Sequence, residues 1–109
     1  MRFDAPTCAR LRRSLLDRGQ VLATLLAELL AGKDKTRSID ALGLNARPGM
    51  RPEEILRAAL DHVEALRKQI EAGDDRYGRC HVCGDDLGLA ALTEVPWSDA
   101  CHAHAGLAR

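Results

Sequence analysis

Four side chains of the kind that bind soft metal ions lie near the C-terminus, in two pairs with the same internal spacing. The first pair is Cys80 and Cys83, and seventeen residues separate it from the second pair, Cys101 and His104. A spacing of two residues lets a tight turn aim both side chains at one point, and two such turns can meet at one tetrahedral ion. Three thiolates and one imidazole fill every position of Zn²⁺, so the pattern predicts one structural zinc ion.

Two other histidines compete with His104 for the fourth position. His81 and His102 each stand beside a ligating cysteine, which is a poor geometry for a shared ion, so His104 is our assignment and His102 stays open as its replacement. Cys8 is left over, and we expect an ordinary buried or half-buried side chain. Since the N-terminus does not resemble an export signal, we expect reduced metal ligands in a cytoplasmic protein and no disulfide framework.

Size, composition and charge limit the class of protein. A chain of 109 residues is one domain, or a small metal-stabilised module joined to one further element. Hydrophobic residues make up 46% and aromatic residues 3%, and the abundance of Leu and Ala favours helices. A net charge of zero gives no support for general nucleic-acid binding, and no apolar run is long enough to predict a membrane span.

The first long helix is predicted over residues 6–31. Asp4 or Thr7 can cap its start, and Gly32 suits the position just past its end. Arg18 interrupts an otherwise regular apolar stripe. The stripe consists of Leu11, Leu15, Leu22, Leu25 and Leu29.

The second long helix is predicted over residues 52–72, from Pro52 to the residue before Gly73. Its apolar stripe follows a heptad pattern and consists of Leu56, Ala59, Val63, Leu66 and Ile70. Neither helix can bury its stripe alone, so the sequence predicts an antiparallel helical hairpin, or coiled coil. The first half of the chain is basic and the second half acidic, which suits two segments that fold onto each other.

The predicted fold is therefore mainly α, with two parts. Residues 1–75 form the helical hairpin, with a tip loop at about 33–51, and residues 76–109 form a small zinc-finger module with a C-terminal tail. Within the tip, Ser38 can cap a short helical turn that reaches Gly43. The tip is basic, because Lys33, Lys35, Arg37, Arg47 and Arg51 face only Asp34 and Asp40. The oligomeric state stays open, since Leu16, Leu26 and Leu30 could form an exposed outer face.

The segment around the first cysteine pair resembles the DksA/TraR family of zinc-finger transcription regulators. That family's finger begins Tyr-Gly-x-Cys-x2-Cys-Gly, and later has Leu and Pro before a second pair of cysteines. The matching residues here are Tyr77, Gly78, Cys80, Cys83, Gly84, Leu92, Pro96 and Cys101, with the same interval between the pairs. The resemblance is specific over roughly residues 55–104. His104 stands where the family commonly has its fourth cysteine, and Ala91 where it has an arginine.

The resemblance implies a regulator that binds RNA polymerase through the hairpin and the finger and alters initiation. In the family, two aspartates and an alanine at the hairpin tip enter the secondary channel of the polymerase, and Asp40-Ala41 is the echo of them here. Guanosine tetraphosphate acts at that interface in the family, but its contacts do not map onto residues of this chain. The same residues also suit a zinc-stapled scaffold for a different protein, and a basic tip favours an acidic partner surface.

Two further classes of function fit the sequence less well. The stretch His62-Val63-Glu64 before the first cysteine pair echoes the zinc deaminases, but Arg79 replaces their proline and the second ligand pair would have no role. We therefore predict that the chain is not an enzyme. A sequence-specific nucleic-acid-binding finger would repel phosphate, because it carries Asp74, Asp75, Asp85, Asp86, Glu94 and Asp99 against Arg76 and Arg79.

Overall fold

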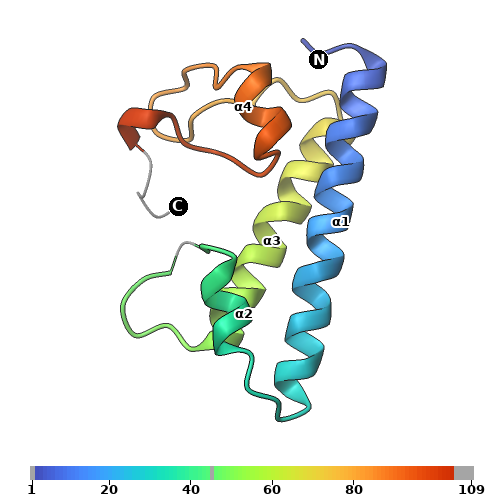
Figure 1. The fold of residues 1–109 in the computed structure, drawn as a ribbon. Helices are drawn as coiled ribbons and strands as arrows, with labels where there is room; N and C mark the ends of the chain where they lie inside the picture. The colour runs from blue at the N-terminus through green and yellow to red at the C-terminus, as the bar shows by residue number, and fades with distance from the viewer. Residues whose placement is uncertain (1, 45, 105–109) are drawn as a thin grey trace.

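The computed structural model describes residues 2–44 and 46–104, and these residues are mainly helical. Two long helices run antiparallel along each other, and the two shorter α-helices lie on one side of this hairpin (Figure 1). The described part of the chain contains no strand, only an isolated antiparallel bridge between Arg79 and Asp86. In chain order the helices are α1 (Ala5–Leu30), α2 (Thr36–Ala41), α3 (Pro52–Glu71), α4 (Leu89–Glu94) and the 3-10 helix η1 (His102–His104). The predicted helical hairpin is confirmed.

The ends of the long helices lie within a residue or so of the predicted positions. The Asp4 carboxylate accepts a hydrogen bond of 2.8 Å from the Thr7 N–H at the start of α1. Beyond the last turn, Gly32 and Gly73 have φ values of +92° and +67°. Only glycine adopts this conformation without a steric penalty, and each glycine lets the chain close the paired hydrogen bonds of a Schellman motif.

The core lies between α1 and α3 and continues beyond both. The stripe leucines Leu11, Leu15, Leu22 and Leu25 are buried against Leu56, Val63, Leu66 and Ile70, whereas Leu29 and Ala59 are partly buried. Ile39 of α2 belongs to the same cluster, as do Tyr77 and Leu92 of the C-terminal segment. The ion pair between Arg12 and Glu71 joins the basic helix to the acidic one. The hairpin and the C-terminal segment therefore share one continuous core.

The connection between the long helices folds back along the hairpin. Its helix α2 begins at Thr36, whose N–H donates to the Asp34 carboxylate at 3.0 Å. The helix therefore starts before Ser38, and the predicted capping by Ser38 was wrong. Ile39 is only 5% exposed and packs into the core, which holds α2 beside α3 (Figure 1).

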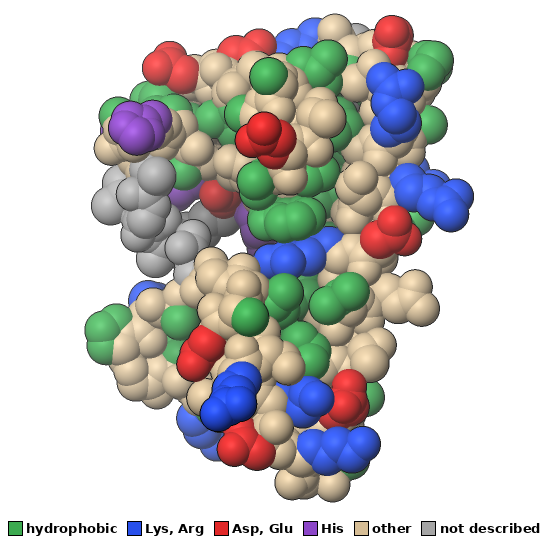
Figure 2. Space-filling model, in the orientation of Figure 1, with side chains coloured by type: hydrophobic (Ala, Val, Ile, Leu, Met, Phe, Trp, Pro, Cys, Tyr) green, Lys and Arg blue, Asp and Glu red, His purple; other side chains and the backbone are tan. Residues whose placement is uncertain are grey.

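The charge of this connection is less one-sided than its own sequence suggests. Lys35 pairs with Glu28 of α1 at 3.1 Å, and Arg51 pairs with Glu54 of α3 at 2.7 Å. Figure 2 shows basic and acidic side chains interspersed over this end of the molecule. Acidic residues of the long helices thus offset the basic residues of the predicted tip.

The outer side of the hairpin keeps some apolar surface. Leu16 is 41% exposed and Leu30 59% exposed, while Leu26 is partly buried against the core. None of the described helices combines the length and the hydrophobicity that a membrane-spanning helix needs.

Leu22→Ala is expected to lower the free energy of unfolding by about 2–5 kcal/mol, because Leu22 is fully buried between the long helices and its truncation leaves a cavity. Leu16→Ala on the same helix is the matched control and should cost less than about 1 kcal/mol, since Leu16 is partly in water already. Urea unfolding followed by circular dichroism measures both. Equal losses would show that the seam between α1 and α3 is not the main core.

Candidate metal centre

Tyr77 anchors the segment that follows α3. Its ring is fully buried, and its hydroxyl donates a hydrogen bond of 2.8 Å to the Pro96 carbonyl. Phe3 meets the ring edge-on, with the ring centroids 6.4 Å apart. Burial raises the pKa of Tyr77 to about 12, with a smaller contribution from Cys8 and an opposing one from Arg2. This one side chain thereby joins the N-terminus and the stretches before both ligand pairs.

Two features of the backbone favour glycine at position 78. Its φ is +80°, and a Cβ added there would lie 2.8 Å from Leu92 Cδ1 and 2.8 Å from Arg2 Nη2. Contacts that short do not occur for real Cβ atoms, so the backbone favours glycine for its conformation and for its close approach to neighbours.

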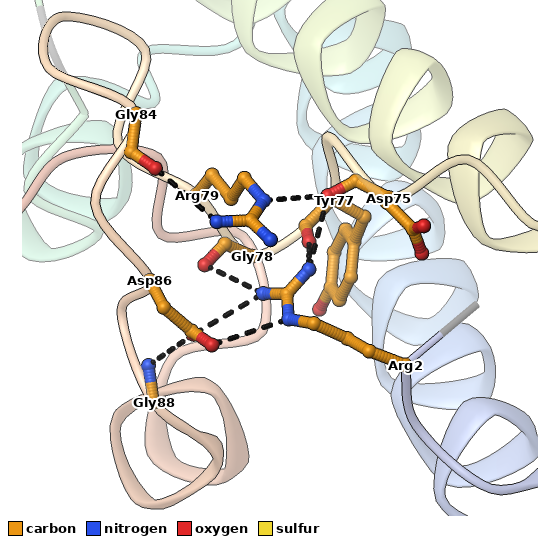
Figure 3. A network of polar contacts seen from close by, with 8 residues as sticks. All are labelled: Arg2, Asp75, Tyr77, Gly78, Arg79, Gly84, Asp86 and Gly88. Carbon is orange, nitrogen blue, oxygen red and sulfur yellow. Dashed lines mark hydrogen bonds and ion pairs between the residues drawn. The ribbon is translucent and has the colours of Figure 1, made fainter.

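Arg2 fastens the N-terminus to the same turn (Figure 3). Its guanidinium donates to the carbonyls of Asp75, Tyr77 and Gly78 at 3.0, 2.9 and 3.1 Å. It also pairs with the Asp86 carboxylate at 3.2 Å. The pKa of Asp86 is lowered, first by the backbone N–H of Gly88 and then by Arg2. Sequence reasoning missed Arg2, because a lone arginine 84 residues from its partner belongs to no local pattern.

The first ligand pair lies on a short turn. The Cys80 N–H donates to the Asp85 carbonyl at 2.8 Å, and the Gly84 N–H donates back to the Cys80 carbonyl at 2.9 Å. Gly84 has a φ of +76°, a left-handed conformation that lets the chain turn sharply after Cys83. The Val82 N–H points at the Cys80 sulfur, 3.4 Å away. The backbone thus places both sulfurs on one side of the turn.

The second ligand pair is held next to the first. The His81 N–H donates to the Asp99 carbonyl at 2.8 Å, which joins the two stretches of chain. The 3-10 helix η1 then closes with a hydrogen bond of 3.0 Å from the His104 N–H to the Cys101 carbonyl. This single turn brings the His104 ring back over Cys101.

The four predicted ligands come together at distances that suit a tetrahedral ion. The ligand atoms of Cys80, Cys83, Cys101 and His104 all lie within 4.8 Å of one another. The two sulfurs of Cys83 and Cys101 are 3.7 Å apart, and His104 Nδ1 lies 3.6 Å from the Cys80 sulfur and 3.1 Å from the Cys101 sulfur. Metal–sulfur bonds of about 2.3 Å and metal–nitrogen bonds of about 2.1 Å give tetrahedral edges of roughly 3.8 and 3.6 Å. The four side chains could therefore hold one metal ion, with His104 binding through Nδ1.

The thiols of this cluster oppose one another's ionisation. Burial disfavours the Cys80 thiolate, but backbone N–H groups, first that of Cys101, more than offset it and lower its pKa to about 5. The Asp85 N–H favours the Cys83 thiolate, yet desolvation and the thiols of Cys80 and Cys101 outweigh it and raise its pKa to about 11. One negative sulfur disfavours the next, so three thiolates at this separation require a cation among them.

The other candidate residues lie outside the cluster. His102 is exposed, and His81 turns its Nε2 into a buried place where no hydrogen-bond partner is found among the described residues. Cys8 is half-buried at the start of α1, with its sulfur 3.7 Å from the Phe3 carbonyl. His62 contacts the Trp97 carbonyl through Nε2 at 3.1 Å. It is not part of the cluster, so the residues that resemble the zinc-deaminase motif do not come together in one site.

The residues that carry the resemblance to DksA/TraR proteins have structural roles here. Tyr77 donates a hydrogen bond to the Pro96 carbonyl, Leu92 is fully buried, and Gly78 has a positive φ in close contact with the side chains of Arg2 and Leu92. Comparisons with family models, with curated proteins and with solved structures found no match to this chain.

Tyr77 should titrate near pH 12 in the folded protein and near pH 10 in the unfolded chain. The folded pKa is the higher one, so the stabilisation is complete below pH 10 and is lost as the pH rises towards 12. The loss amounts to about 2–3 kcal/mol. Tyrosinate absorbance reports on this residue alone, because the chain has one Tyr.

Tyr77→Phe is the matched control. Because this variant has no phenol to ionise, its free energy of unfolding should fall less between pH 10 and pH 12 than that of the wild type. A folded-state pKa near 10 would show that the hydroxyl is in water and not bonded to Pro96.

Proposed function

We propose that this chain is a non-catalytic protein-binding module, in which a zinc-bound C-terminal segment holds a helical hairpin, and that its partner is RNA polymerase. The observation that carries the proposal is the cluster of Cys80, Cys83, Cys101 and His104 at one end of the hairpin. Their spacing and the surrounding Tyr-Gly and Pro residues resemble the finger of the DksA/TraR regulators.

Zinc is the metal that suits this set of ligands best. Thiolates are soft ligands, and a tetrahedral site made of cysteine and histidine is typical of Zn²⁺. Four protein ligands leave no coordination position for water or substrate, so the ion would supply structure and not catalysis. Binding would also neutralise the thiolates that otherwise oppose one another.

A polymerase partner is supported by the motif and by the exposed surface of α2. Asp40 and Ala41, the residues that echo the family's tip, are both exposed on α2. Their helix lies beside α3, so they face outward from the side of the hairpin. The polymerase would therefore contact the hairpin and the side that carries α2.

A different protein partner is the second candidate, and the position of α2 favours it. The connecting segment is packed against the hairpin through Ile39, and Lys35 and Arg51 already have acidic partners in α1 and α3. A segment packed in this way offers a binding surface on the side of the hairpin. The tip of the DksA/TraR hairpin, in contrast, enters a narrow channel. A zinc-stapled scaffold for another protein uses the same residues.

Cys101→Ser should abolish stoichiometric zinc binding and destabilise the protein by several kcal/mol, because a structural zinc site contributes its binding energy to folding. The wild-type chain is expected to retain one zinc ion in native mass spectrometry. Near-ultraviolet circular dichroism of Trp97 follows the loss of structure.

Cys8→Ser is the control for the cysteine substitution. It should keep the zinc ion and lose less than about 1 kcal/mol, because Cys8 lies outside the cluster. Retention of zinc by Cys101→Ser, or its loss from Cys8→Ser, would contradict the assigned ligands.

Labelled wild-type protein should bind core RNA polymerase, and a known secondary-channel factor should displace it. Asp40→Asn should keep most of the binding and change the effect on initiation, since the exposed Asp40 is the residue that echoes the family's tip. Fluorescence anisotropy measures the binding and a run-off assay the effect.

Binding without competition would place the contact elsewhere on the polymerase. Absence of binding at micromolar concentration, with zinc-loaded protein, would reject the polymerase and favour the scaffold.

A further inference from the structure

Arg18 stands where the apolar stripe of α1 predicts a leucine. Its neighbours in the stripe, Leu15 and Leu22, are both fully buried, and the Arg18 side chain is itself partly buried. Burial lowers the pKa of Arg18, although an arginine this basic stays charged at neutral pH. A cation drawn out of water needs partners, and Arg18 finds two of them in different parts of the molecule.

The first partner is the indole of Trp97 in the C-terminal segment. The guanidinium carbon of Arg18 lies 4.1 Å from the centroid of this ring. The negative face of an indole attracts a cation, and the attraction grows as water is excluded. Trp97 comes four residues before the proposed ligand Cys101.

Two hydrogen bonds hold the backbone around Trp97, one to α3 and one to the turn that carries the first ligand pair. The Trp97 carbonyl accepts a hydrogen bond of 3.1 Å from the His62 ring of α3, which must donate because a carbonyl only accepts. Two residues later the Asp99 carbonyl accepts from the His81 N–H, beside the first ligand pair. The position of the indole therefore depends both on α3 and on the stretch between the two ligand pairs.

The second partner of Arg18 is the carbonyl of Leu42, which accepts from Nη2 at 3.3 Å. Leu42 directly follows α2, and the last carbonyls of a helix have no partner inside it. A helix of six residues is not stable by itself. The burial of Ile39, the packing of Leu42 and the ion pair of Lys35 with Glu28 support α2, and the contact with Arg18 adds a further tertiary support at its end.

We propose that Arg18 couples the metal centre to α2, so that α2 is fully docked on the hairpin only while the metal holds Trp97 in place. The inference rests on the metal binding proposed above. The C-terminal segment and α2 lie on the same side of the hairpin, one beyond the other along α3, and Arg18 contacts both (Figure 1). It is a positioning residue and takes no part in binding the metal.

The coupling follows from how the cation is solvated. When the metal is removed, the stretch around Trp97 keeps its hydrogen bonds to His62 and Tyr77 but loses its attachment to the ligand pairs, so the ring is held less firmly against the guanidinium. A partly buried cation without the ring face is better solvated outside, so the side chain of Arg18 turns to water and releases the Leu42 carbonyl. α2 then keeps the burial of Ile39, the packing of Leu42 and the ion pair of Lys35 with Glu28, but loses the hydrogen bond at its end. Because such coupling is reciprocal, undocking α2 must weaken metal binding by the same factor.

Hydrogen exchange of residues 36–42, followed by mass spectrometry on the full chain, tests the coupling. Chelation of zinc should speed exchange of this segment by about 3-fold to 30-fold, the effect that one partly desolvated cation–π contact and one hydrogen bond supply. Arg18→Met should show the same fast exchange with zinc still bound, and chelation should then add little. Arg13→Met, an exposed arginine of α1, is the matched control and should behave as wild type.

A double-mutant cycle with Trp97→Leu tests whether Arg18 and Trp97 protect residues 36–42 through one shared interaction. In the zinc-loaded protein this variant should match Arg18→Met, and the double variant should add nothing further, because both remove one interaction. Additive effects would overturn the coupling, as would a segment 36–42 that stays protected in zinc-loaded Arg18→Met. Failure of the wild type to bind zinc would overturn the metal proposal as well, whereas zinc binding without a response in α2 rejects the coupling alone.

Discussion

The structure depends on the closure of two distant turns, at residues 80–83 and 101–104, onto one point. The described chain beyond α3 buries few hydrophobic side chains, namely Tyr77, Cys80 and Leu92. Its helices α4 and η1 are too short to be stable by themselves. Its turns contain glycines, which lose more conformational entropy on folding than other residues do. A segment with so little core needs a strong local constraint, and a metal ion bound by the four clustered side chains would supply one. Tyr77, Arg2 and Trp97 then join that constraint to the hairpin.

Much of the fold could be predicted from local patterns. The stripes of α1 and α3, their capping residues and the glycines beyond their ends repeat over many residues, so each position supports the others. The cluster of Cys80, Cys83, Cys101 and His104 could be predicted for the same reason, since two pairs with identical spacing are typical of a metal site. Their signal lies within a few residues of chain, and the structure assembles them as expected.

What could not be predicted rests on single long-range contacts. Arg2 reaches carbonyls more than seventy residues away, and Arg18 meets Trp97 from a different part of the chain. Neither contact leaves a periodic pattern. The packing of α2 was missed because the residues that produce it, Ile39, Leu42 and Leu44, lie in a short irregular segment where no repeated spacing marks a buried face. The break at Arg18 in the stripe of α1 was visible in the sequence, but its meaning required Trp97 beside it.

Several residues that resemble the DksA/TraR finger, among them Tyr77, Gly78 and Leu92, hold the fold of this chain, so they support a polymerase partner through the resemblance alone and not through contacts they could make. Recognition of a partner must rely on surface outside the motif, and the exposed side of α2 is such a surface. If Arg18 links α2 to the metal centre, a partner that prefers docked α2 also binds the metal-loaded form more tightly. Linkage then requires that this partner strengthen metal binding by the same factor, so the metal would act on recognition from a distance without touching the partner.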